Sequence, residues 1–229
     1  MEVIILAGGK GTRLSGVVSD VAKPMAPVNG KPFLYYLFKW LKQYPVEKVI
    51  LSTGYMSESI EDYFGRSFDG IPVEYVREEK PLGTGGAIMF ALRKTKSDNI
   101  LIINGDTYFP INIINLFSFH VTNHNLVSIA LKQMQNFSRY GSVECEKDTI
   151  LKFNEKKFCS DGLINGGIYV INKQYLESKQ ISGAFSLETE ILEKEAGTSH
   201  IKGLVFGDLF IDIGIPEDYH RAQTLPELR

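Results

Sequence analysis

The chain has 229 residues, of which 44% are hydrophobic and 23% are charged. This composition is ordinary for a soluble α/β domain with a large core, and no segment is long and apolar enough to span a bilayer. The formal net charge of −2 excludes a broad basic surface, so we expect no nucleic acid partner, no membrane partner and a cytoplasmic location.

The two cysteines, Cys145 and Cys159, are too few for a disulfide framework and show no metal-ligand spacing. We therefore expect both to be reduced thiols. The sequence contains no internal repeat, linker or low-complexity segment, so we expect one domain over residues 1–229.

The first predicted element is a strand that runs into a glycine-rich loop. Residues 3–6 (VIIL) form a β-branched and leucine run typical of a buried strand. Residues 7–13 (AGGKGTR) place three glycines within four positions, which lets backbone N–H groups approach a ligand closely. Together with Arg13 and the downstream Lys23, these groups suit a polyphosphate, and we expect the loop to hold a nucleoside triphosphate.

Other phosphate-binding loops do not fit this spacing. A dinucleotide fingerprint requires a third glycine where Arg13 stands and an acid at the end of the next strand, but residues 51–54 (LSTG) contain no acid. A Walker A loop requires Ser or Thr after Gly-Lys, and here Gly11 follows. A plain strand-to-helix turn would explain neither Arg13 nor the Lys-Pro step at residues 23–24.

The next elements alternate between helices and strands. We expect a helix over residues 34–42, a strand over 46–52, a helix over 57–64 with Ser57 as N-cap, and a strand over 73–76. This alternation predicts an α/β fold with a Rossmann-like, mostly parallel sheet and helices on both faces.

A second glycine-rich turn, PLGTGG at residues 81–86, precedes a helix predicted over residues 87–92. Gly85 and Gly86 would allow close approach of a base or a ribose. A plain helix N-terminus capped by Thr84 explains the same residues, and the residues alone leave the two interpretations open.

An apolar strand is predicted over residues 99–104, and Asp106 follows directly after its end, in the segment Gly105-Asp106-Thr107. An acid at the carboxyl end of a central strand lies where open α/β sheets bind ligands, and its hard oxygens suit Mg²⁺. The alternative is a turn aspartate that caps the next segment.

The remaining elements are shorter. We expect a short helix within residues 109–119, a strand over 126–132, a strand over 163–170, a helix from 186 and a final helix over 217–223. Between them, FNEKK at residues 153–157 has the composition of a solvated charged turn.

The sequence LAGGKGTRL at residues 6–14, followed by KPM at 23–25, resembles the signature of sugar-1-phosphate nucleotidylyltransferases, and matching segments continue to about residue 219. These enzymes join a nucleoside triphosphate to a sugar 1-phosphate and release pyrophosphate. The segments RYGSV, FNEKK, LINGGIY and FIDIGIPEDY further resemble the branch that transfers GMP from GTP to D-glycero-D-manno-heptose 1-phosphate for cell-surface polysaccharides. Some relatives append a left-handed β-helix, which we do not expect here.

The resemblance assigns roles to particular residues. It implies a nucleotide site formed by Leu6, Ala7, Gly8, Gly9, Gly11, Thr12, Arg13, Lys23, Gly83, Thr84, Gly85 and Asp106. It implies a sugar-phosphate site formed by Tyr140, Gly141, Glu155, Lys156, Asn165, Gly166 and Glu188. It also implies one Mg²⁺ held by Asp106 and Asp212, with Arg13 and Lys23 completing the catalytic set. The sequence is compatible with a homo-oligomer.

The expected reaction is an in-line displacement, in which the sugar phosphate attacks the α-phosphorus of the triphosphate. Arg13 would hold pyrophosphate, Lys23 the α-phosphate and Lys156 the sugar phosphate. Mannose or glucose 1-phosphate, and GTP, UTP, CTP or dTTP, stay open as substrates. A non-catalytic sugar-nucleotide sensor would be expected to lose Arg13, Lys23 or one of the two aspartates, and the chain retains all four.

Overall fold

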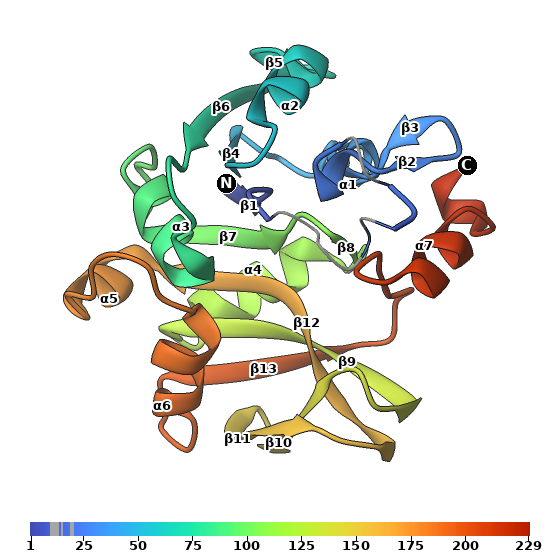
Figure 1. Cartoon of the computed structure of the whole chain (residues 1–229). Helices are drawn as coiled ribbons and strands as arrows, with labels where there is room; N and C mark the ends of the chain where they lie inside the picture. Colours follow the sequence, from blue (N-terminus) through green and yellow to red (C-terminus); the bar gives the residue numbers. More distant parts are fainter. Residues whose placement is uncertain (10–13, 15, 19–20) are drawn as a thin grey trace.

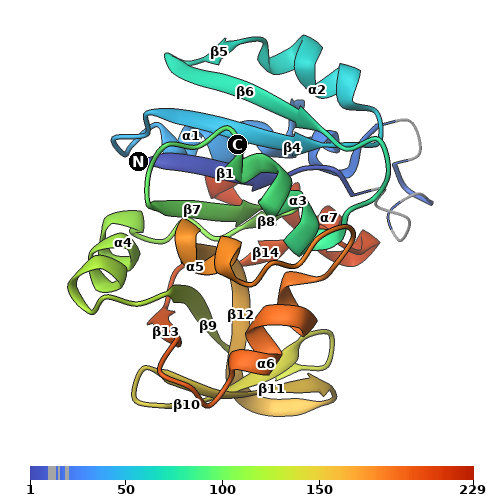
Figure 2. The ribbon, with the colours of Figure 1, turned by 90° about the vertical axis from the view of Figure 1, so that its left-hand side faces the viewer.

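The computed structural model describes residues 1–9, 14, 16–18 and 21–229. Its centre is a ten-stranded sheet, seen in Figure 1 and from a second direction in Figure 2. The strands are β1 (Glu2–Leu6), β4 (Lys48–Thr53), β5 (Ser67–Phe68), β6 (Ile71–Arg77), β7 (Asn99–Asn104), β9 (Val127–Phe137), β10 (Gly141–Glu146), β11 (Thr149–Lys156), β12 (Cys159–Asn172) and β13 (Ile201–Phe206). Their order across the sheet is β10-β11-β13-β9-β12-β7-β1-β4-β6-β5.

One half of the sheet, formed by β7, β1, β4 and β6, is parallel. Strand β1 pairs in parallel with β4 and β7, and β4 pairs in parallel with β6, so that Val3 lies beside Val49 and Leu101. The carboxy-terminal half adds antiparallel pairings, because β12 runs antiparallel to both β7 and β9. The predicted α/β fold is confirmed, and the sheet as a whole is mixed.

Helices cover both faces of this sheet, as predicted. They are α1 (Phe33–Leu41), α2 (Ser57–Phe64), α3 (Gly83–Leu92), α4 (Ile113–Thr122), α5 (Lys173–Ser178), α6 (Glu193–Glu195) and α7 (Pro216–Ala222), with a π-helical turn over Glu188–Leu192 and 3₁₀ turns over Lys23–Met25 and Pro226–Leu228. Successive residues of a strand point to opposite faces. Val3 and Ile5 therefore join the core cluster that contains α1, whereas Ile4 joins the cluster that contains Ile88 of α3.

Two short ribbons lie outside the main sheet. One pairs β2 (Pro27–Val28) with β3 (Lys31–Pro32), and the other pairs β8 (Thr107–Tyr108) with β14 (Ile211–Asp212). Figure 1 shows β8 beside the carboxy-terminal α7, far from β8 in the sequence. The second ribbon therefore brings the end of β7 next to the last quarter of the chain.

The N-caps of α2 and α3 are not the residues considered from the sequence. Helix α2 begins at Ser57, but its N-cap is Met56 in the left-handed region (φ 55°), and the buried Ser57 hydroxyl has no hydrogen-bond partner among the described residues. The prediction of Ser57 as N-cap is therefore wrong. Helix α3 begins at Gly83 with Leu82 as its N-cap, so Thr84 lies inside the helix and does not cap it.

Cys145 and Cys159 are both free, as predicted. Within the part of the chain that the structure describes, every helix is too short or too polar to cross a membrane.

Candidate active site

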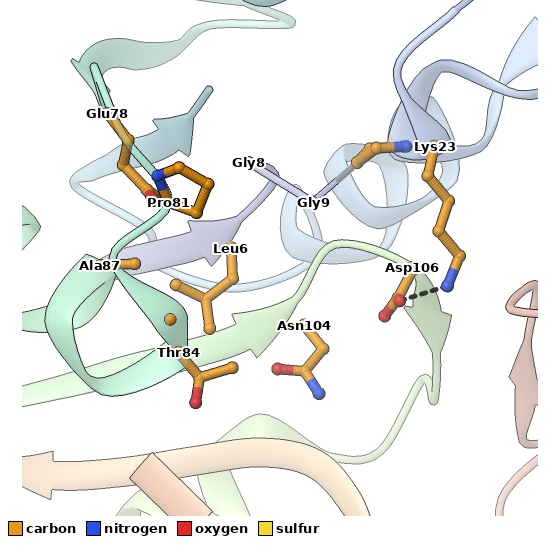
Figure 3. Close-up of a pocket in the computed structure, with 12 residues that line it drawn as sticks. Leu6, Gly8, Gly9, Lys23, Glu78, Pro81, Thr84, Ala87, Asn104 and Asp106 are labelled. Carbon is orange, nitrogen blue, oxygen red and sulfur yellow. Dashed lines mark hydrogen bonds and ion pairs between the residues drawn. The ribbon is translucent and has the colours of Figure 1, made fainter. Parts of the chain in front are cut away.

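A cavity of about 300 Å³ opens at the carboxyl ends of β1 and β7, beside the start of α3 (Figure 3). This is the edge at which open α/β sheets bind ligands. The cavity is lined by Leu6, Gly8, Gly9, Lys23, Pro24, Glu78, Pro81, Gly83, Thr84, Ala87, Asn104 and Asp106. Most of the residues predicted to bind the nucleotide therefore meet here.

Two other residues predicted to bind the nucleotide do not line the cavity. Ala7 and Gly85 are buried and do not line this cavity. Gly11, Thr12 and Arg13 fall outside the residues that the structure describes.

One end of the cavity is a cluster of one cation and two carboxylates. The Lys23 ammonium donates a hydrogen bond to Oδ2 of Asp106 at 2.5 Å and lies 3.7 Å from Oδ1 of Asp212. The Lys23 side chain is only 13% exposed. Its charge is therefore held between the two acids at the edge of the cavity.

The β8–β14 ribbon brings the two acids together. Asp106 immediately precedes β8, and Asp212 pairs with Thr107 across the ribbon. The Ile213 N–H donates to the carbonyl oxygen of Asp106 at 3.0 Å, and the Gly214 N–H donates to Oδ1 of Asp212 at 2.7 Å. A side chain at position 214 would crowd this carboxylate, because an added Cβ would lie 2.8 Å from Oδ1 of Asp212.

The cluster carries more negative charge than Lys23 neutralises. Burial, and next the charge of Asp106, raise the pKa of the Asp212 carboxyl above its ordinary value, although Lys23 opposes the shift. No group of three His, Cys, Asp or Glu side chains in the described ranges could hold a metal ion alone. Asp106, which lines the cavity, and Asp212, which lies beside it across Lys23, do fit Mg²⁺, which takes one or two protein carboxylates and completes its shell with substrate phosphates and water.

Asp212 lines a second cavity, of about 230 Å³, which also contains Arg139 and Tyr140. Arg139 pairs with Asp218 and lies 3.4 Å from Oδ2 of Asp212. The Tyr140 hydroxyl donates to the same oxygen at 3.5 Å, and burial raises the pKa of Tyr140 to about 12, so the hydroxyl keeps its proton. Lys23 and Asp106 line the first cavity and Asp212 lines the second, so the contact of Lys23 with Asp212 links the two cavities.

Two more of the predicted sugar-site residues lie near Tyr140. Gly141 begins β10 and pairs with Lys156 of β11. Lys156 and its neighbour Glu155 are both exposed, and neither lines one of the two cavities. The structure thus places Gly141 and Lys156 side by side, directly after Tyr140 of the second cavity.

Glu188 accepts a hydrogen bond from Thr84, which lines the first cavity. The Thr84 hydroxyl donates to Oε2 of Glu188 at 2.6 Å, and the Ser186 hydroxyl donates to the same oxygen at 2.7 Å. The Leu187 N–H in turn donates to the Thr84 oxygen at 2.8 Å. These bonds join the start of α3 to the π-helical turn that begins at Glu188.

The register between β12 and β9 shifts between Asn165 and Tyr169. Asn165 and Gly166 lie at the start of this irregularity. Asn165 donates to the Tyr169 hydroxyl oxygen at 2.9 Å and accepts from the Gly167 N–H at 2.9 Å. A Cβ at Gly166 would lie 2.5 Å from the Phe109 ring. Close packing against Phe109 therefore accounts for a glycine at position 166.

Internal packing also explains the glycines of α3. A Cβ at Gly85 would lie 2.1 Å from the Phe185 ring, and one at Gly86 would lie 2.6 Å from the Gly183 carbonyl oxygen. The N–H groups of Gly85 and Gly86 both point at the Phe185 carbonyl oxygen. Their small size thus admits residues 183–185, and a role for Gly85 in nucleotide binding stays a prediction.

Sequence reasoning missed several residues at the site. Glu78 and Pro81 follow β6, and Asn104 ends β7, so the carboxyl ends of parallel strands were the available signal. Arg139 stands directly before the predicted Tyr140. Asp218 gave no signal, because acids are common in the first turn of any helix.

Comparison with known proteins agrees with this geometry. The family model described as nucleotidyl transferase matches residues 2–227. The D-glycero-alpha-D-manno-heptose 1-phosphate guanylyltransferase of Aneurinibacillus thermoaerophilus is 48% identical over 97% of each chain. The protein of the same name from Campylobacter jejuni is 43% identical over 96% of this chain and 97% of its own.

Among solved structures, HddC from Yersinia pseudotuberculosis complexed with GMP-PN superimposes with a TM-score of 0.86 at 35% identity, over 97% of both chains. The match in sequence and the match in fold therefore cover almost the same length of chain. The chain belongs to the nucleotidyl transferase family.

Proposed function

We propose that this enzyme transfers GMP from GTP to D-glycero-α-D-manno-heptose 1-phosphate, giving GDP-heptose and pyrophosphate. The observation that carries the proposal is the 48% identity, over nearly the whole of both chains, to a heptose 1-phosphate guanylyltransferase. Two cavities linked by the contact of Lys23 with Asp212 agree with a reaction between two phosphorylated substrates.

In this reaction an oxygen of the heptose 1-phosphate attacks the α-phosphorus of GTP, and the bond from that phosphorus to pyrophosphate breaks. Such transfers depend on positioning and on neutralising charge, and little on covalent or acid–base groups. We assign the triphosphate to the cavity beside α3, where Gly8 and Gly9 present backbone to the ligand. Gly11, Thr12 and Arg13 remain assigned to the triphosphate by prediction.

Lys23 would bind the α-phosphate. Its ammonium already lies among oxygen acceptors at the cavity edge, so a phosphate oxygen can replace Asp106 as its partner. Asp106 and Asp212 would hold Mg²⁺, which supplies positive charge to the phosphate oxygens when it is bound. Without that ion the two carboxylates would repel the incoming triphosphate.

The heptose 1-phosphate would enter from the side of Tyr140. Tyr140 lines the second cavity, and Lys156 pairs with the next residue, Gly141, from the neighbouring strand. Asn165, Gly166, Glu155 and Glu188 complete the proposed sugar-binding set. Arg139 is held by Asp218 and Asp212, and we add it to the set because its guanidinium places positive charge in this cavity.

The experiment that tests this function measures pyrophosphate release. The enzyme is offered GTP, ATP, CTP, UTP or dTTP, each with heptose, mannose or glucose 1-phosphate and Mg²⁺. We expect the highest kcat/KM with GTP and the heptose 1-phosphate. Preference for UTP or dTTP with glucose 1-phosphate would overturn the assignment, and absence of release with every pair would favour a non-catalytic binding protein.

A further inference from the structure

Thr84 lines the cavity beside α3, but its hydroxyl bonds away from the phosphate end of that cavity. Figure 3 shows Thr84 at the start of α3, apart from the Lys23–Asp106 pair. The Thr84 hydroxyl accepts from the Leu187 N–H at 2.8 Å and donates to Oε2 of Glu188 at 2.6 Å. A hydroxyl carries one proton and a carboxylate only accepts, so Thr84 has no proton left to donate to a nucleotide.

A second hydroxyl holds the same carboxylate oxygen. Ser186 donates to Oε2 of Glu188 at 2.7 Å and accepts from the Thr189 N–H at 3.3 Å. The bonds from Thr84 and Ser186 fill the acceptor sites of Oε2. From the residues that the structure describes, Oε1 accepts no hydrogen bond. The Glu188 carboxylate is therefore held by one oxygen and presents the other.

The backbone that leads to Glu188 is fixed as well. The Phe185 carbonyl oxygen accepts from the N–H groups of Gly85 at 3.0 Å and Gly86 at 3.3 Å. Glu188 then begins the π-helical turn, an uncommon conformation that is frequent at functional sites. The start of α3, in which Thr84 lies, thus sets the position of Glu188 through both backbone and side chain.

Glu188 lies on the side of the proposed sugar-binding set. Burial, and next the charge of Glu188, raise the pKa of the Tyr169 hydroxyl, so the carboxylate lies near that hydroxyl. The same hydroxyl oxygen accepts from Asn165, another member of the set, at 2.9 Å. A carboxylate oxygen in this place suits a sugar hydroxyl, because it accepts and the hydroxyl can donate.

Resting on the proposed function, we propose that Thr84 is a positioning residue for the sugar 1-phosphate. Its hydroxyl anchors Oε2 of Glu188 and leaves Oε1 to accept a hydrogen bond from a hydroxyl of the sugar. Thr84 also lines the cavity assigned to the triphosphate, so the start of α3 shapes both substrate sites. Loss of the hydroxyl frees Glu188 to turn away from the sugar, while the shape of the cavity is kept.

The test measures KM for each substrate separately. Thr84→Val keeps the shape of the side chain and removes the hydroxyl. We expect KM for heptose 1-phosphate to rise roughly three- to tenfold, with kcat and KM for GTP within about twofold of wild type. Thr84→Ser restores the hydroxyl and should recover the wild-type KM. Thr189→Val is the matched control, since Thr189 is exposed beside Glu188 and lines neither cavity; it should keep all wild-type values.

A double variant separates positioning from a purely structural role. Glu188→Gln should itself raise KM for heptose 1-phosphate, because the amide oxygen must serve Thr84 and its amino group then faces the sugar. Since Thr84 acts through Glu188, adding Thr84→Val to Glu188→Gln should raise this KM no further. A second rise of full size would overturn the proposal. So would an unchanged KM for heptose 1-phosphate in either single variant.

Thr84→Val also removes the acceptor of the Leu187 N–H, so its thermal unfolding is measured first. If this variant fails to fold, Ser186→Ala decides. It removes the other hydrogen bond to Oε2 and should raise the same KM at least roughly twofold, and an unchanged KM would overturn the proposal. Wild-type enzyme that prefers another sugar 1-phosphate would refute the proposed function instead, and the same comparison is then made with that sugar.

Discussion

Lys23 is the residue on which the charge balance of the site depends. Among the described residues it is the one cation within 4 Å of both Asp106 and Asp212, and its side chain is mostly buried. Removing one partner from a buried ion pair leaves charge uncompensated, and this destabilises a protein more than loss of a surface pair does.

We therefore expect Lys23→Gln to lower both stability and turnover. In a metal-free buffer, thermal unfolding should show a loss of roughly 1–3 kcal/mol. Addition of Mg²⁺ should raise the melting temperature of the variant more than that of the wild type, because the ion replaces the lost cation. Lys39→Gln, which removes an exposed pair with Asp69, should change neither property. An equal response to Mg²⁺ in both proteins would contradict the account.

At the scale of elements, the start of α3 is fixed by contact with residues 183–185. We expect Gly85→Ala to destabilise the protein by about 1–3 kcal/mol, because its methyl group would overlap the Phe185 ring. Adding Phe185→Ala to this variant should recover part of the loss. Gly207→Ala is the control, since an added Cβ there meets no atom within 4 Å. An unchanged melting temperature for Gly85→Ala would refute the packing role.

Helix α4 is joined to the sheet by a buried histidine. His120 lies 3.0 Å from the Ser128 hydroxyl and 3.1 Å from Oδ1 of Asn99. Because the Asn99 oxygen only accepts, Nε2 carries the proton and Nδ1 accepts from Ser128, so the ring is neutral. Burial lowers the pKa of His120 to about 4.

This lowered pKa predicts a pH dependence of stability. The unfolded histidine takes up its proton near pH 6.5 and the folded one only near pH 4. The stabilisation is therefore complete above about pH 6.5 and is lost as the pH falls toward 4. In denaturant titrations, His120→Gln should remove this part of the acid sensitivity, whereas His124→Gln on the adjacent turn should not. Equal acid sensitivity in wild type and His120→Gln would contradict the prediction.

At the scale of the whole molecule, the parallel half of the sheet could be read from the sequence. The runs at residues 3–6 and 99–104 are apolar, and their carboxyl ends place Leu6 and Asp106 at the cavity. Local pattern is sufficient there, because each buried strand of a parallel sheet is apolar on both faces.

The antiparallel half of the sheet and the assembly of the site could not be read from local sequence, because they depend on contacts between distant parts of the chain. The approach of Asp212 to Asp106 depends on a ribbon of two residues per strand, which is too short to leave a periodic pattern. The antiparallel pairing of β12 with β9 and the contact of Gly85 with Phe185 are equally non-local. For Asp212, resemblance to a family supplied what local sequence could not.

The most direct test of the central claim is pyrophosphate release by Asp106→Asn and Asp212→Asn with GTP, heptose 1-phosphate and Mg²⁺. Each change keeps the shape of the side chain and removes the charge that the proposed cation requires. Asp208→Asn, at an exposed position outside both cavities, is the control. We predict that both site variants fold and lose turnover, while the control keeps it. Near-normal release from either site variant would contradict the claim that these two carboxylates hold a metal ion for the reaction.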